Sequence, residues 1–385
     1  MKILFVQKIA GISGSEKYLF EIMPELISRG HDCHFLGIAE KKSEKKNTKI
    51  LEEFRNKNIT VHYLIYRNWF VWTLLKKIHA ILRKENYDIV QSNLIHADFW
   101  MSLVKRFWHK NMVLVSGKHG FDNEYVAKYG FSTKKIFSSY ILIQKIADSK
   151  INRSFFIGRR LMELFVELNI TKKERAEVIY YGFRFPAYRL TVSGAKFRFA
   201  SRQILIVGRL VKYKGHALGL NILKDILLQM PDTKLVIVGD GPERNSIESK
   251  IRELGLENYV ILTGHSTEVM EYMLNSDLLI IPSVAEGFGI IALEAFSNKL
   301  PVLAFNVPTL NEIIKNRKTG YLTAFGDPKT FKDTVMEILN IEAERKHKIT
   351  DAAYEELTRK FSIERMVNET MKFYEHARNK KYRLR

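Results

Sequence analysis

The chain has 385 residues, a formal net charge of +20 and one cysteine, and 46% of its residues are hydrophobic. This length predicts two domains that each bury a core, and the apolar content excludes a disordered or fibrous protein. The single cysteine excludes a disulfide framework and a cysteine-based zinc site. No apolar run reaches the length of a membrane span, so we expect a soluble protein of the cytoplasm.

The positive charge is concentrated in the first half of the chain. Residues 1–190 carry 33 Lys and Arg against 18 Asp and Glu, so this half holds fifteen of the twenty excess charges. A field of this sign attracts an anionic partner, such as a nucleic acid, an acidic membrane surface or a substrate with phosphate groups. Charge alone does not distinguish among the three.

Short apolar runs rich in β-branched residues alternate with longer amphipathic segments along the chain. In the first half, the runs predict strands at Ile3–Val6, Cys33–Leu36, Thr60–Leu64, Asp88–Val90 and Met112–Val115. In the second half, they predict strands at Gln203–Val207, Lys234–Val238, Val260–Leu262, Leu278–Ile281 and Pro301–Ala304. Glu16–Arg29 and Trp69–Lys84 are predicted helices, and Glu40–Lys49 is a predicted solvated loop. The alternation favours the α/β class, with two doubly wound units of parallel sheet.

A break in periodicity at Pro186–Arg202 predicts the boundary between the two units. We therefore assign residues 1–190 to an N-terminal Rossmann-like domain and residues 195–361 to a C-terminal one. The last segment, residues 362–385, has helical periodicity, and we expect it to pack back on the first domain.

Glycine turns that follow predicted strands are the candidate ligand sites, because ligands of open α/β sheets bind beyond the carboxyl ends of the strands. Gly11–Glu16 follows the first strand and opens a helix, although a tight turn would explain it equally well. Further along, Arg209 and Lys214 follow a strand and suit a diphosphate, with a solvated basic turn as the alternative. Val238–Pro242 would form a floor for a flat ring, or a plain β-turn.

The strongest motif is Pro282–Ala295, in which Glu286 and Glu294 flank a glycine turn that opens a helix. The glutamates would accept hydrogen bonds from hydroxyl groups, and the helix N-terminus would cradle an anion. The backbone N–H groups expected to point toward that anion belong to Phe288, Gly289, Ile290 and Ile291. Carboxylate, anion cradle and carboxylate in this order are what a sugar–phosphate–ribose ligand requires.

Over essentially the whole chain, these motifs resemble retaining GT-B glycosyltransferases of family 4, the glycosyl transferases group 1. Besides Glu286 and Glu294, the segments that match in order and spacing are Gly14–Glu16, Gly208-Arg209, Lys214-Gly215, Val238–Pro242, Leu262–Gly264, Ser276-Asp277, Pro301-Val302 and Phe361–Glu364 with Tyr374. Three segments depart from the family. Its frequent His-x-His is Gln91-x-Asn93 here, and its usual Asn-Gly in the interdomain loop is Tyr181-Gly182. Its usual glycine before the Pro-Val strand is displaced by Asn298–Leu300.

The resemblance implies a GT-B fold, in which an acceptor-binding and a nucleotide-sugar-binding domain face each other across a cleft. Arg209 and Lys214 would neutralise the diphosphate as it leaves. Glu294 would hold the ribose hydroxyls, and Glu286 would contact the transferred sugar. His119 lies where relatives place a histidine near the sugar and the acceptor, although it could equally be a structural turn residue. The implied donor-binding positions are Gly14, Gly208, Gly239, Gly264, Phe288, Gly289, Ile290, Ile291 and Glu294.

The activity implied by the resemblance is retaining transfer of a sugar from a nucleotide diphosphate sugar, with a UDP-sugar favoured by family frequency. We expect no metal and no other cofactor, because the sequence lacks an Asp-x-Asp pair. The leaving phosphate oxygen would then help to deprotonate the acceptor hydroxyl. The alternative is a GT-B epimerase or hydrolase that acts without an acceptor. A nucleic-acid partner is not expected, since no known binding module is present, and roles for His96 and His265 stay open.

Aromatic and basic residues interleave in three segments of the first half, Tyr66–Lys77, Phe99–Lys110 and Lys128–Phe137. Such helices suit the surface of an anionic bilayer, with core-facing aromatic residues under a solvated cationic face as the alternative. Together with the charge excess, this favours peripheral attachment to the inner leaflet of the cell membrane. A lipid-linked or lipopolysaccharide- or capsule-type glycan is then the expected acceptor.

Overall fold

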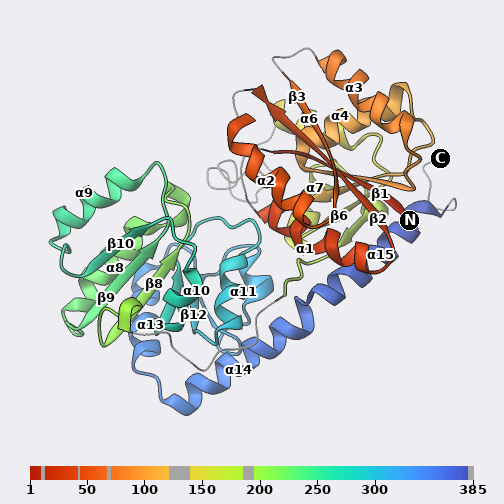
Figure 1. Cartoon of the computed structure of the whole chain (residues 1–385). Helices are drawn as coiled ribbons and strands as arrows, with labels where there is room; N and C mark the ends of the chain where they lie inside the picture. The colour runs from red at the N-terminus through yellow and green to blue at the C-terminus, as the bar shows by residue number, and fades with distance from the viewer. Residues whose placement is uncertain (10–13, 42–43, 67–70, 121–138, 185–194, 380–385) are drawn as a thin grey trace. The chain divides into compact units, whose positions relative to one another are not determined.

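The computed structural model describes residues 1–9, 14–41, 44–66, 71–120, 139–184 and 195–379, which form two compact units (Figure 1). Of these residues, unit 1 holds 1–120, 139–184 and 361–379, and unit 2 holds 195–360. Most of the predicted boundary segment, Pro186–Arg202, lies outside the described residues.

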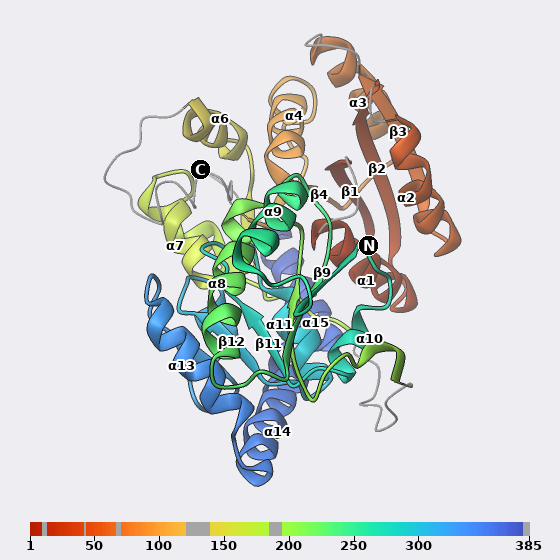
Figure 2. The same cartoon turned by 90° about the vertical axis from the view of Figure 1, so that its left-hand side faces the viewer.

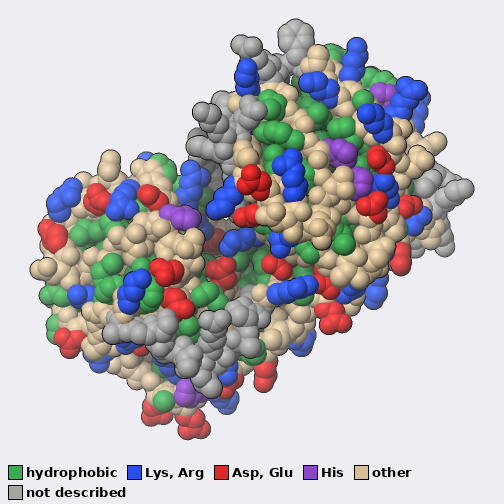
Figure 3. All heavy atoms as spheres, in the orientation of Figure 1, with side chains coloured by type: hydrophobic (Ala, Val, Ile, Leu, Met, Phe, Trp, Pro, Cys, Tyr) green, Lys and Arg blue, Asp and Glu red, His purple; other side chains and the backbone are tan. Residues whose placement is uncertain are grey.

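Unit 1 is built on a parallel sheet of seven strands in the order β3-β2-β1-β4-β5-β6-β7. The strands are β1 (Lys2–Lys8), β2 (Asp32–Glu40), β3 (Thr60–Tyr66), β4 (Ile89–Asn93), β5 (Leu114–Lys118), β6 (Arg153–Phe156) and β7 (Ala176–Val178). The flanking helices are α1 (Gly14–Ser28), α2 (Glu44–Asn56), α3 (Val71–Lys84), α4 (Leu94–Phe107), α6 (Ser139–Asp148), α7 (Arg159–Glu167) and α15 (Ile363–Arg378). Over α3, Lys and Arg side chains lie beside hydrophobic ones on the surface (Figure 3).

Unit 2 contains a parallel sheet of six strands in the order β10-β9-β8-β11-β12-β13. The strands are β8 (Arg202–Val207), β9 (Thr233–Val238), β10 (Val260–Gly264), β11 (Leu278–Ile281), β12 (Val302–Phe305) and β13 (Tyr321–Thr323). Helices flank this sheet (Figure 2), namely α8 (His216–Leu227), α9 (Arg244–Leu254), α10 (Val269–Leu274), α11 (Ile290–Ser297), α12 (Leu310–Ile313), α13 (Pro328–Leu339) and α14 (Ala343–Lys360).

Each sheet has a point at which the direction of strand order reverses. It lies between β1 and β4 in unit 1 and between β8 and β11 in unit 2. Because all strands in a parallel sheet end at the same edge, the loops on either side of this point diverge there and leave room for a ligand. Two doubly wound parallel sheets confirm the predicted fold class, and they direct attention to the loops after β1, β4, β8 and β11.

The predicted loop at Glu40–Lys49 is wrong. Helix α2 begins within it, at Glu44, and the side chain of Asn47 is fully buried. The first turn is rich in lysine, and the apolar face of the helix begins only one turn later. Its residues Ile50, Leu51 and Phe54 point inward and are at most 5% exposed. Burial of this apolar face fixes the helix despite its polar first turn.

Helix α15 packs against α1 within unit 1 (Figure 1). Its N-cap Ser362 accepts a hydrogen bond from the backbone N–H of Arg365, and its inner face buries Phe373 and Tyr374 completely. The residue pair Phe183 and Ser362 forms a parallel bridge where the chain enters the helix. The C-terminal helix is therefore part of the packing of unit 1.

Gly182 lies where the segment after β7 meets the start of α15. A Cβ atom at this position would collide with the carbonyl oxygen of Ser362 and lie 2.8 Å from Cβ of Met366. We expect Gly182→Ala to lower the free energy of unfolding by about 1–3 kcal/mol, because the segment or the helix must shift. Chemical denaturation measures this change. The control is Gly287→Ala, whose added Cβ would meet nothing within 4 Å, and equal losses in the two variants would contradict the prediction.

Candidate active site

Three strand ends of unit 2 meet through glycine backbone. Gly208 and Gly239 follow β8 and β9, Gly264 ends β10, and their φ angles are positive, at 156°, 150° and 73°. The N–H of Gly208 donates to the carbonyl of Val238, and the N–H of Gly239 donates to that of Gly264, both at 2.9 Å. A Cβ on Gly239 would collide with the carbonyl oxygen of Gly208. Glycine therefore brings three of the predicted donor-binding positions side by side.

An ion pair joins the two loops at the reversal point of unit 2. Lys214 lies after β8, and its Nζ donates to Oε1 of Glu286, in the loop after β11, at 2.6 Å. The Glu286 side chain is 6% exposed and that of Lys214 is 20% exposed. Two predicted catalytic residues that are 72 positions apart in the sequence thus come together, because β8 and β11 are neighbouring strands.

Backbone contacts hold the same two loops in register. The N–H of Val284 donates to the carbonyl of Tyr213 at 2.8 Å. Gly215 has a φ of 74°, and a Cβ there would collide with the carbonyl oxygen of Pro282. Because Gly215 has no side chain, the two loops can approach closely, and Lys214 comes to lie opposite Glu286.

The N-terminus of α11 lies just beyond Glu286. Gly289 caps the helix with a φ of 79°, and a Cβ there would lie 2.7 Å from a methyl group of Leu310 in α12. The first residues of the helix, Ile290 and Ile291, are half-buried, and Phe288 is 4% exposed. The first N–H groups of a helix have no partner within it and carry the positive end of the helix dipole, so this edge can hold an anion.

Thr309 supports the Glu286 loop, a role that sequence reasoning missed. Its hydroxyl donates to the carbonyl oxygen of Glu286 at 3.0 Å, and its side chain is 6% exposed. Its φ of 79° is unfavourable for a β-branched residue, so the surrounding packing must hold it there. The only sequence signal is the preceding Pro308, which marks a turn.

Of the two predicted phosphate-binding cations of unit 2, one has an ion-pair partner and the other has none within the described residues. Lys214 is paired with Glu286, whereas Arg209 is exposed and has no ion-pair partner within the described part of the chain. Glu294 is half-buried one turn into α11. The guanidinium of Arg209 is therefore available to an incoming anion.

His216, the first residue of α8, is a second residue that sequence reasoning missed. It is 3% exposed, and neither ring nitrogen has a hydrogen-bond partner among the described residues. Burial, with a smaller effect from the positive charge of Lys214, lowers the pKa of His216 from 6.5 to about 4. The ring is therefore neutral at physiological pH. The sequence signal that could have identified His216 is its position directly after Lys214-Gly215.

In unit 1, His119 follows β5 and is half-buried. Its Nε2 lies 2.8 Å from Oδ1 of Asn93, at the end of β4, and its Nδ1 lies 2.5 Å from the hydroxyl of Tyr181. Burial, helped by the neighbouring charge of Lys118, lowers the pKa of His119 to about 3. Gly14 begins α1 on the far side of the reversal point, between β1 and β4.

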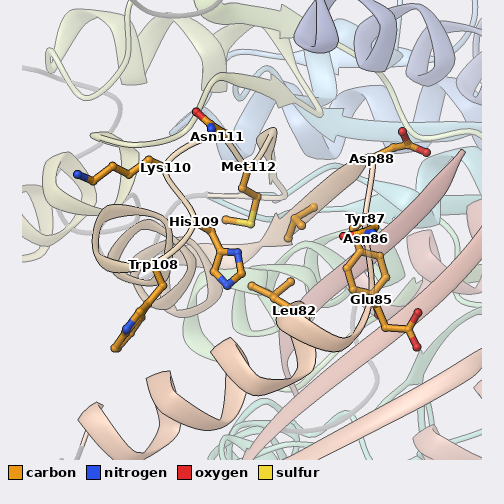
Figure 4. A pocket seen from close by; sticks show the side chains of 11 residues that line it. Leu82, Glu85, Asn86, Tyr87, Asp88, Trp108, His109, Lys110, Asn111 and Met112 are labelled. Carbon is orange, nitrogen blue, oxygen red and sulfur yellow. The ribbon is translucent and has the colours of Figure 1, made fainter.

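Two further histidines were left open by the sequence. His96 and His265 are both exposed. A cavity of about 400 Å³ in unit 1 (Figure 4) is lined by Glu85–Asp88 on one side and Trp108–Met112 on the other. These segments precede β4 and β5, so the cavity lies at the amino ends of the strands, the opposite edge from His119.

Two family models match the chain. The model described as "Glycosyl transferases group 1" matches residues 196–356, and that described as "Glycosyltransferase Family 4" matches residues 12–184. Together they span most of the chain. The chain is a glycosyltransferase of the family 4 type. The family expected from the sequence motifs is thus confirmed, and the protein is a transferase.

Similar proteins include an uncharacterized glycosyltransferase of Methanocaldococcus jannaschii, 24% identical over 91% of each chain. The capsular polysaccharide biosynthesis glycosyltransferase CapM of Staphylococcus aureus is 26% identical over 55% of this chain and 59% of its own. Anabaena HepE, solved in complex with UDP, has a TM-score of 0.79 at 19% identity and covers 97% of this chain and 99% of its own. HepE is also solved with UDP-glucose. These matches confirm the GT-B fold and do not favour an epimerase or hydrolase.

Among the described residues, none of the helices combines the length and apolarity that crossing a bilayer requires. Nor do those residues group three or more His, Cys, Asp or Glu side chains as a metal site would.

The low pKa of His216 predicts a loss of stability in mild acid. The unfolded chain protonates this ring near pH 6.5, whereas the folded protein keeps it neutral to about pH 4. Between these values the unfolded state binds one more proton, so the free energy of unfolding falls by at most about 1.4 kcal/mol per pH unit as pH drops. We expect His216→Asn to flatten this slope in urea denaturation, and His347→Asn, at an exposed histidine of α14, to leave it unchanged. Equal slopes in all three proteins would contradict the prediction.

Proposed function

We propose that this glycosyltransferase moves a sugar from a nucleotide diphosphate sugar, a UDP-sugar, to a glycan acceptor with retention of anomeric configuration. The observation that carries the proposal is the Lys214–Glu286 pair at the reversal point of unit 2, next to Arg209 and the N-terminus of α11. A pyrophosphate needs fixed positive charge and N–H donors, and its sugars need carboxylates that accept from hydroxyls. The complexes of HepE with UDP and UDP-glucose support the choice of donor.

In this proposal, each group at the edge has its own task. Arg209 and the first N–H groups of α11 stabilise the negative charge that grows on the leaving diphosphate. The ammonium group of Lys214 has three N–H donors, so it can reach a phosphate oxygen while it still holds Glu286. The second carboxylate oxygen of Glu286 is then available to a hydroxyl of the transferred sugar, and Glu294 holds the ribose. With these charges in place, the reaction uses no metal.

We also propose that the acceptor is a lipid-linked glycan of the lipopolysaccharide or capsule type, reached at the inner face of the membrane. The support comes from a surface that we call the α3–α4 patch, formed by Trp72, Phe107 and Trp108 with the basic residues Lys76, Lys77, Arg106 and Lys110. Trp72 is 54% exposed and Phe107 is 47% exposed. Their ring centroids are 5.1 Å apart, and Trp72 lies 6.1 Å from Trp108.

The four basic residues of the α3–α4 patch are exposed, and the surface over α3 shows basic and hydrophobic side chains together (Figure 3). Exposed aromatic rings flanked by cations suit the headgroup region of an anionic bilayer. CapM, which is named for capsular polysaccharide biosynthesis, supports this class of acceptor. Of the three interleaved segments, Lys128–Phe137 lies outside the described residues.

Arg209→Ala should lower kcat more than it raises KM for the donor. Loss of one preorganised donor to a developing negative charge costs about 10²–10³-fold in kcat, and Lys212→Ala, at an exposed lysine of the same turn, should cost nothing measurable. The assay follows UDP release from UDP-glucose in EDTA, with membrane lipid extract as the source of acceptor. A requirement for Mn²⁺ or Mg²⁺, equal effects of both variants, or turnover that is independent of the extract would contradict the proposal.

Membrane binding by the α3–α4 patch can be tested separately from turnover. Flotation with anionic phosphatidylglycerol vesicles should recover the wild type, and the double variant Trp72→Ala and Phe107→Ala should float several-fold less. Leu228→Ala, at an apolar residue of unit 2 that is 85% exposed, is the control and should float like the wild type. Equal flotation with neutral and anionic vesicles, or none with either, would contradict the proposal.

A further inference from the structure

A buried chain of hydrogen bonds in unit 1 connects α15 with His119. The hydroxyl of Tyr374, in α15, donates to Oε1 of Gln91 at 2.6 Å. Nε2 of Gln91 donates to Oδ1 of Asn93 at 2.9 Å, and the same oxygen lies 2.8 Å from Nε2 of His119. On the other side of the ring, the hydroxyl of Tyr181 lies 2.5 Å from Nδ1. Side chains that are 283 positions apart in the sequence are thus joined end to end.

The direction of these bonds assigns the proton on the histidine. Because the carbonyl oxygen of Asn93 can only accept, Nε2 of His119 carries the hydrogen, and Nδ1 accepts from Tyr181. Gln91 and Asn93 are fully buried, so water does not compete for their amides. Nδ2 of Asn93 has no partner in the described part of the chain, so two bonds to the oxygen alone orient this side chain.

Packing leaves the His119 ring little room to turn. Three aromatic rings have centroids between 5.0 and 5.9 Å from it, those of Tyr18, Tyr181 and Phe155. A Cβ on Gly117 would lie 2.7 Å from both Nε2 of His119 and Oδ1 of Asn93, so this glycine of β5 makes space for their hydrogen bond. Hydrogen bonds at both nitrogens and rings around the imidazole hold it in one place.

We propose that Tyr374, Gln91 and Asn93 are positioning residues, which hold His119 in one orientation and one tautomer at the carboxyl edge of the unit 1 sheet. The effect on turnover rests on the proposed function and on the place that the family resemblance implies for His119, near the transferred sugar and the acceptor. The proposal explains why this protein has the amides Gln91 and Asn93 where the family often has a His-x-His motif. A side-chain amide both donates and accepts hydrogen bonds, and it does not titrate near neutral pH. A change of pH in this range therefore cannot reverse the direction of these hydrogen bonds.

NMR of the histidine side chains in the full-length protein tests the hydrogen bonds to His119 without any substrate. With ¹⁵N-labelled histidine, and His119→Asn to assign the signal, we expect the proton on Nε2 and no titration between about pH 5 and pH 8. Tyr374→Phe should shift or broaden this signal. Tyr321→Phe is the matched control, because it removes a buried hydroxyl of unit 2 that has no hydrogen-bond partner among the described residues. A proton on Nδ1, titration in this range, or equal effects of both variants would overturn the proposal.

Steady-state kinetics test whether the hydrogen bonds that position His119 affect the rate of sugar transfer. In the UDP-glucose assay, Tyr374→Phe should lower kcat by about tenfold or more with little change in KM for the donor, and Tyr321→Phe should lower neither. Asn93→Asp places a carboxylate beside Nε2–H, so it should raise the pKa of His119 and add an ionisation to the pH profile of kcat. If the wild type turns over neither UDP-glucose nor any other UDP-sugar, the proposed function fails while the NMR result stands. If it turns over and Tyr374→Phe behaves like Tyr321→Phe, the positioning role fails alone.

Discussion

The ion pair between Lys214 and Glu286 fixes the arrangement of the site in unit 2. A carboxylate that is only 6% exposed would be costly without a cationic partner, so the two loops that carry the pair must stay together. The close contact of Gly215 with Pro282 and the hydrogen bond from Thr309 to the Glu286 carbonyl hold these loops from both sides. Because the pair is internally neutral, the charge offered to a ligand comes from Arg209 and from the N-terminus of α11.

The corresponding edge of unit 1 has a different chemistry. Around His119, the contacts are made by amides, phenolic hydroxyls and aromatic rings, and the histidine itself is neutral. The nearest strong charge, Lys118, turns inward and pairs with the buried Asp98 at 2.7 Å. The edge of unit 2 thus carries an exposed cation and a helix N-terminus, whereas the neutral groups around His119 in unit 1 are buried and hydrogen-bonded to one another.

The sequence alone predicted ten of the thirteen strands in the described part of the chain and the glycine turns at the ends of β8, β9 and β10, because apolar runs and glycine turns are local patterns. It missed β6, β7 and β13, which are short and interrupted by polar residues, whereas the equally short β11 and β12 are uninterrupted apolar runs. It also missed the contacts of Thr309 with Glu286 and of Asn93 with His119, which join residues 23 and 26 positions apart. Glu286 and Lys214 were both predicted, but their direct contact follows from the neighbouring places of β8 and β11, which no single segment encodes. Roles that arise from strand order are thus beyond local sequence patterns.

The state of His119 also bears on where a proton can go in the proposed reaction. An acceptor hydroxyl must lose its proton as it attacks the sugar, and a histidine is the usual base for such a step. Here Nε2 carries a hydrogen that is donated to Asn93, and the one basic lone pair of the ring, on Nδ1, accepts from Tyr181, so it is not available to an acceptor hydroxyl. A pKa of about 3 would in any case make this ring a weak base. The proposed function instead assigns this proton to the oxygen that leaves with the diphosphate. Arg209 and α11 would stabilise its charge, and transfer of the proton on the same face as departure is consistent with retention.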